Sequence, residues 1–212
     1  MTGPPTDELI ASLAAKAAPV RPLASPLRRA GLTLALLLAA GAALVLLWGD
    51  SAALARRYAG RETLMMVEMG AMVLTAASAV TAAFVLSIPG GSRRWMLAPL
   101  APFAAWIGLS GVGCLGTAGI GALHSADCLL FILGASLAVG TPLLWRLARA
   151  RPIDPLPVAL TGGLGAAALA ALLLQFFHPF AVTFVDLGVH LTAVLLVVAV
   201  VTVARRRLLA PA

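Results

Sequence analysis

The chain has 212 residues, of which 61% are hydrophobic, and its mean hydropathy is +1.02. Only 11% of the residues are charged, against about 25% in a soluble domain. This composition excludes an ordinary soluble enzyme, because too few polar residues remain to cover a water-soluble surface. The net charge of +7 would favour nucleic acid as a partner of a soluble protein. In so apolar a chain we expect the basic residues to set membrane topology instead.

The first 30 residues are predicted to be a cytosolic tail that carries one short amphipathic helix. Thr6 is a suitable N-cap, and Leu9, Ile10 and Leu13 then fall on one helical face. Pro19 is expected to end the helix. A lone helix of about 13 residues is marginal in water. The segment is therefore either a frayed tail or an element that folds when its apolar face docks on a partner.

Six apolar runs follow, each close to the roughly 20 residues that a membrane-spanning helix needs. We predict an all-α, polytopic bundle of six transmembrane helices over residues 31–204, followed by a basic cytosolic C-terminus, 205–212. The first run could also be the core of a signal peptide, but it is long for one, and five more runs follow it. The six runs are Gly31–Trp48, Thr63–Leu86, Trp95–Gly113, Asp127–Ala148, Pro157–Phe177 and Ala181–Ala204.

Basic residues are distributed unevenly between the two sides of such a bundle. Twelve of the fifteen Lys and Arg residues lie in the tail, the second and fourth loops and the C-terminus, and only Arg56, Arg57 and Arg61 lie in the other loops. Cytoplasmic loops of membrane proteins carry an excess of Lys and Arg. We therefore predict a multi-pass protein of the bacterial inner membrane with both termini in the cytoplasm.

Polar residues that fall at membrane depth gather near the opposite, non-cytoplasmic side of the predicted bundle. Such residues are costly in a bilayer and are candidates for function. Asp186 and His190 are four residues apart and so share one helical face. The full set is Glu68, Cys114, His124, Asp127, Cys128, His178, Asp186 and His190.

Three interpretations of this set remain open. In the first, the groups are satisfied locally, Asp186 pairs with His190, and the cysteines are small apolar fillers. In the second, Cys114 and Cys128 form a permanent or switchable disulfide, since they are the only two cysteines and both face an oxidising compartment. In the third, thiolate and imidazole groups bind a soft metal, although the spacing matches no standard zinc pattern.

Four segments of the chain resemble a known family. They are DELIASLAAKAAPVRPL in the tail, LSIPGGSRRWMLAPLAPFAAWIGLSGVG, DCLLFILGASLAVGTPLLWRLARARPIDP and GVHLTAVLLVV. Together, in this order and over nearly the full length, they resemble the NrsF-type integral-membrane anti-sigma factors. The resemblance implies a six-helix protein that holds an extracytoplasmic-function (ECF) sigma factor at the inner membrane. It further implies release of that factor under oxidant or metal stress.

The resemblance also implies roles for particular residues. Cys128 in DCLLFI matches one of two family cysteines important for the response, whereas His178 in FFHPF stands where the second is expected. Cys114 is the only other thiol, so Cys114, Cys128 and His178 are the sensor candidates, with the remaining polar residues of the set as their neighbours. In the tail, Leu9, Ile10, Leu13 and Arg21 are expected to bind the sigma factor. No enzymatic activity, cofactor or direct nucleic-acid contact is expected.

Two other functions compete with this one. A membrane thiol–disulfide oxidoreductase would use the two cysteines, although the chain has no Cys-x-x-Cys motif. A small transporter would line a path with Glu68, Asp186 and His190, although no polar trail crosses the cytoplasmic half of the spans.

Overall fold

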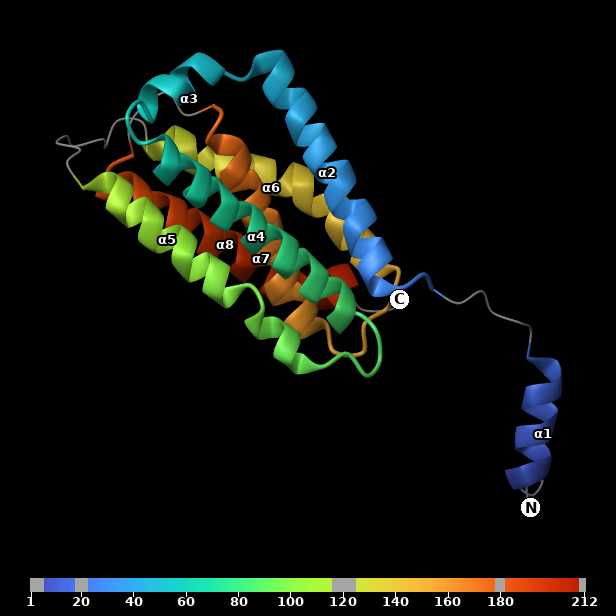
Figure 1. The fold of residues 1–212 in the computed structure, drawn as a ribbon. Coiled ribbons are helices and arrows are strands. Elements are labelled where there is room, and N and C mark those ends of the chain that lie inside the picture. The colour runs from blue at the N-terminus through green and yellow to red at the C-terminus, as the bar shows by residue number, and fades with distance from the viewer. Residues whose placement is uncertain (1–5, 18–22, 116–124, 178–181, 210–212) are drawn as a thin grey trace.

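The computed structural model describes residues 6–17, 23–115, 125–177 and 182–209, and all regular elements in these residues are helices (Figure 1). In chain order they are α1 (Thr6–Lys16), α2 (Pro26–Trp48), α3 (Ser51–Arg57), α4 (Glu62–Leu86), the 3-10 helix η1 (Arg93–Leu97), α5 (Leu100–Cys114), α6 (Ser125–Ala148), α7 (Pro155–Leu174) and α8 (Phe184–Leu209).

Among the described residues, six helical segments are long and apolar enough to cross a membrane, as the sequence predicts. They are α2, α4, η1 with α5, α6, α7 and α8, and each runs opposite to the one before it. We call the end where α2 begins and α8 finishes the proximal end. The other end, where α2 finishes and α8 begins, is the distal end.

The spans begin and end at positions that local capping explains. The first span, α2, starts at Pro26 rather than Gly31. The Ser25 side chain accepts a hydrogen bond from the Arg28 amide there, and proline suits the first helical position. The last helix continues beyond Ala204 to Leu209. Residues 26–30 and 205–209 therefore belong to the helices rather than to the flanking segments.

The third span is interrupted near its beginning. Its first part is the 3-10 helix η1, and Pro99 lies at the cap position from which α5 starts. Proline has no amide hydrogen and cannot continue the backbone ladder of a preceding helix. The change from η1 to α5 is therefore a direct consequence of Pro99.

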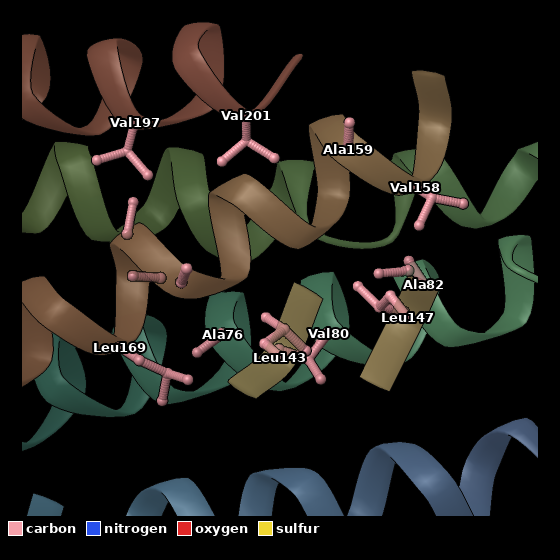
Figure 2. Close-up of a cluster of buried hydrophobic side chains, with 14 of the residues drawn as sticks. Ala76, Val80, Ala82, Leu143, Leu147, Val158, Ala159, Leu169, Val197 and Val201 are labelled. Atoms are coloured by element: carbon pink, nitrogen blue, oxygen red, sulfur yellow. The ribbon is translucent and has the colours of Figure 1, made fainter. Parts of the chain in front are cut away.

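The centre of the bundle is built by α4 and α7, with α6 and α8 packed against α7 (Figure 2) and α5 packed against α4. Of the apolar 18-residue stretch that could span a membrane, 72% is buried in α7 but only 11% in α2. Alanine and glycine are frequent in the central pair, most of all in α7, and such small residues allow two backbones to approach closely. At Gly165 an added Cβ would lie only 2.7 Å from the Val80 side chain, which shows how tightly the helices are packed.

The distal end is tied together by the segment that contains α3, a helix that the sequence does not predict. The Asp50 amide donates to the Phe176 carbonyl at 3.2 Å, which joins the end of α2 to the end of α7. Arg61 donates to the Gly113 carbonyl at 3.1 Å and so reaches the end of α5. The α3 segment thus caps the distal end, where the polar residues of interest lie.

Candidate functional site

A buried polar cluster lies at the distal end and is centred on Glu68 of α4. Glu68 is only 5% exposed. Its Oε1 accepts a hydrogen bond from the Ser110 hydroxyl of α5 at 2.7 Å, and its Oε2 accepts one from the Tyr58 hydroxyl at 3.1 Å. The Tyr58 hydroxyl also lies 3.5 Å from Oε1 of Gln175, at the end of α7, and Gln175 Nε2 donates to the Met72 sulfur at 3.7 Å. The cluster therefore joins α4, α5, α7 and the segment after α3.

A small cavity of about 20 Å³ adjoins this cluster. Its lining includes Glu68, Ser110 and Gln175, together with the half-buried His190 of α8. A cavity of this size holds roughly one water molecule, and these side chains supply the polar partners that a buried water requires. The arrangement thus brings Glu68 and His190, two members of the predicted polar set, to the same cavity.

The two cysteines lie at the same end of the bundle and are buried thiols, with no disulfide between them. Cys114, at the last residue of α5, is 1% exposed, and Cys128, in the first turn of α6, is 6% exposed. Cys128 belongs to an apolar cluster that includes Ile132 of its own helix, Ala170 of α7 and other small or aliphatic residues of α7 and α8.

Asp186 has a clear local role at the start of α8. Its Oδ2 accepts hydrogen bonds from the Thr183 amide at 3.0 Å and from the Thr183 hydroxyl at 2.8 Å. The Thr183 hydroxyl oxygen in turn accepts from the Asp186 amide at 3.3 Å. This reciprocal arrangement is a capping box, which satisfies amides that an α-helix leaves unpaired at its N-terminus. The predicted pairing of Asp186 with His190 stays a prediction.

Of the remaining polar residues in the predicted set, the structure describes only Asp127. Asp127 is exposed in the first turn of α6, while His124 and His178 lie outside the described residues. Among the residues that the structure does describe, no three His, Cys, Asp or Glu side chains are grouped closely enough to hold a metal ion. The metal interpretation thus gains no support from the described part of the site.

The predicted sigma-binding residues lie on α1, where every residue is exposed. Leu9, Ile10 and Leu13 have exposed fractions of 49%, 58% and 61%. Arg21 lies outside the described residues. An apolar face of this kind on a short helix, with no packing partner in the described part of the chain, is available to another molecule.

Three members of the distal cluster are missing from the sequence-based set, namely Tyr58, Ser110 and Gln175. Tyr58 is the only tyrosine in the chain, and Gln175 interrupts an apolar run. These were the available signals, but neither indicates which partner the side chain finds. The pairings join residues that are 10, 42 and 117 positions apart.

The fold and the site define a class: an all-helical chain with six helices apolar enough to cross a membrane and a buried polar cluster at one end. The chain belongs to the NrsF family, since residues 13–210 match the family model described as "Negative regulator of sigma F". That match begins within α1 and covers all six long helices. No match was found among curated proteins or among solved structures.

Proposed function

We propose that this protein is a membrane-embedded anti-sigma factor that holds an ECF-type sigma factor at the bacterial inner membrane until an oxidant or metal signal arrives. The observation that carries the proposal is the family match over residues 13–210, whose description names negative regulation of a sigma factor. Six helices of membrane-spanning length supply an anchor suited to that role.

The distribution of charge supports an orientation with the proximal end in the cytoplasm. Arginines at the proximal end outnumber those at the distal end, as the positive-inside rule requires of the cytoplasmic side. The proximal arginines include Arg28, Arg29, Arg93, Arg94, Arg146, Arg149, Arg151, Arg205, Arg206 and Arg207. Both α1 and the C-terminus then face the compartment that contains sigma factors.

In this proposal α1 is the element that captures the sigma factor. Its eleven residues are too few for a stable isolated helix in water. Docking of Leu9, Ile10 and Leu13 in an apolar groove would both order the helix and bury its exposed face. The tail then acts as a tether, and the bundle keeps the captured partner at the membrane.

The experiment changes the apolar face of α1 and compares it with a matched change on the other face. Leu9→Asp with Leu13→Asp is expected to release the sigma factor into the soluble fraction, because two carboxylates cannot enter an apolar groove without a large desolvation cost. Ala11→Asp with Ala15→Asp has the same spacing and charge on the opposite face, and retention is expected to persist. Membrane and soluble fractions are compared by quantitative immunoblotting. Unchanged retention in the Leu9/Leu13 variant would overturn the assignment to this face.

The signal input is proposed to be the pair Cys114 and Cys128 at the distal end. A peroxide that oxidises the pair takes two electrons and two protons, forms the disulfide and leaves as water or as an alcohol and water. A soft metal ion would instead displace the thiol protons and bind thiolate. Either event would have to open the tightly packed distal end, because both thiols are buried. Such a change can bias a two-state bundle toward release.

Cys114→Ser and Cys128→Ser, singly and together, test this input. Each is expected to retain the sigma factor in unstressed cells and to lose its release by the oxidant or the metal. The matched control is Ala170→Ser, which alters the same packing cluster as Cys128 but leaves both thiols in place. Normal release in the double cysteine variant would show that the signal enters elsewhere.

A further inference from the structure

Two arginines meet at the proximal end, between α2 and α6, far along the bundle from the distal cluster. Arg29 Nη2 donates to the Arg146 carbonyl at 3.0 Å, and Arg146 Nη1 donates to the Thr33 hydroxyl at 3.0 Å. The Thr33 hydroxyl donates in turn to the Arg29 carbonyl at 2.7 Å. Both arginine side chains are half-buried, and the Arg29 guanidinium lies 4.9 Å from the centre of the Phe84 ring.

The hydrogen bonds of this pair go only to uncharged acceptors. Neither arginine forms an ion pair with a described residue, and Asp154, at the start of α7, is engaged by Arg93 at 2.7 Å. Arg29 Nη1 is buried and has no hydrogen-bond partner among the described residues. The pair therefore keeps two positive charges side by side, partly removed from water, with no negative charge to balance them.

An anion between or beside the guanidinium groups would remove this imbalance. Like charges repel more strongly as the local dielectric falls, and a partly buried charge is costly without a counter-charge. The planar guanidinium fork matches the oxygens of a phosphate and binds them with short, charge-assisted hydrogen bonds.

The position of the pair identifies the source of that phosphate. Arg29 lies in the first turns of α2 and Arg146 in the last turn of α6, so both lie at the proximal boundary of the apolar spans. In a bilayer this depth is occupied by lipid headgroups. Basic pockets between helices on the cytoplasmic side are known to take acidic headgroups.

We propose that Arg29 and Arg146 form a binding site for the phosphate of an anionic phospholipid headgroup. The inference rests on the membrane embedding proposed above but not on the identity of the protein partner. Bound lipid would join α2, the least buried of the six spans, to α6. It would thereby fix the base of the helix from which the α1 tail extends.

The test measures the thermal stability of the full chain in mixed micelles that contain phosphatidylglycerol or phosphatidylcholine. The test variant is Arg29→Gln with Arg146→Gln. The control is Arg28→Gln with Arg149→Gln, which removes the same charge at exposed positions on α2 and directly after the end of α6. A headgroup without acyl chains, glycerophosphoglycerol, is added separately. The quantity compared is the excess of Tm in phosphatidylglycerol over Tm in phosphatidylcholine, so any intrinsic destabilisation of a variant cancels.

We expect wild-type protein and the control to show an excess of a few degrees, and the test variant to show roughly half of it or less. Native mass spectrometry should show one fewer retained phosphatidylglycerol on the test variant. If the glutamine variant does not fold, Arg29→Lys with Arg146→Lys takes its place. Its retained lipid is expected to fall, because an ammonium group cannot bind a phosphate bidentately.

An unchanged excess in the test variant would overturn the site, and so would an equal loss in the control. An equal effect of glycerophosphoglycerol would overturn the phospholipid as the source and leave a soluble phosphate ester. If the membrane embedding itself is wrong, wild-type protein will show no lipid dependence and will extract without detergent. Retention of the sigma factor, measured on the same variants, separates failure of this site from failure of the anti-sigma function.

Discussion

At the scale of single residues, Glu68 is the most consequential side chain at the distal end. A carboxyl group inside an apolar bundle loses its hydration, and an unpaired one would be strongly unfavourable. Here the hydroxyl groups of Ser110 and Tyr58 hydrogen-bond to its two oxygens. Because these donors come from different segments, the carboxyl group orders the distal end as well as being stabilised by it.

Glu68→Ala is expected to lower the free energy of unfolding by about 1–3 kcal/mol, because the buried Ser110 hydroxyl is left without its acceptor. Ser110→Ala removes the other partner. The double variant is expected to lose less than the sum of the two single variants, since they share one interaction. Unfolding is followed by circular dichroism in detergent micelles. Thr141→Ala, at an exposed position on α6, is the control and should change little; simple additivity of Glu68 and Ser110 would contradict the account.

The sequence identifies the buried acids of the site but not their hydrogen-bond partners, for a physical reason. An acid within an apolar run is conspicuous, so Glu68 and Asp186 were identified. Their partners depend on which helices are neighbours, and apolar spans carry little information about neighbours. Asp186 illustrates this, because its bonds to Thr183 make it a helix-capping residue.

At the scale of elements, the packing of α7 on α4 depends on the absence of side chains. In a bilayer no water drives helices together, so close backbone approach at small residues supplies much of the association. Gly165 faces Val80 so closely that a methyl group would lie 2.7 Å from its Cγ2 and 3.3 Å from its backbone nitrogen. A contact with backbone cannot be relieved by rotation of a side chain.

Gly165→Ala is therefore expected to destabilise the bundle by roughly 1–3 kcal/mol, as is typical of overpacking. Gly108→Ala is the matched control, because nothing lies within 4 Å of the Cβ that it would add on α5. There the gain in helix propensity should leave stability equal or slightly higher. The midpoints of thermal unfolding in detergent are compared. Equal stability of the two variants would show that α4 and α7 do not pack as described.

The lengths and order of the helices were predictable because hydropathy and proline mark them directly. All six predicted runs correspond to helices long and apolar enough to cross a membrane. The true start of α2 depends on a cap by Ser25, which precedes the apolar run. Helix α3 was missed, because seven residues between two spans show no periodicity strong enough to distinguish a helix from a loop.

At the scale of the whole molecule, the most apolar spans are not the most buried ones. The two most apolar spans, α2 and α8, are among the least buried, whereas α4 and α7 form the centre. This order suits a bilayer, in which large aliphatic side chains face lipid and small residues allow close packing inside. Sequence alone predicts six spans, but the hydropathy of a span does not indicate whether it lies at the centre of the bundle.

Most basic residues and the buried acids and thiols gather at opposite ends of the bundle. Basic residues gather at the proximal end, the buried thiols and acids lie at the distal end, and α1 extends beyond the proximal end (Figure 1). This separation fits a protein that receives a signal on one side of a membrane and holds a partner on the other. The account therefore depends on whether α1 captures a sigma factor.

The most direct measurement is quantitative co-purification from solubilised membranes of unstressed cells, with the tag at the C-terminus. The full chain is compared with a chain that lacks residues 1–24, which keeps all six spans. The account predicts that a sigma factor is recovered with the full chain and is lost on truncation. Recovery of no sigma factor with the full chain, or equal recovery with the truncated one, would contradict it.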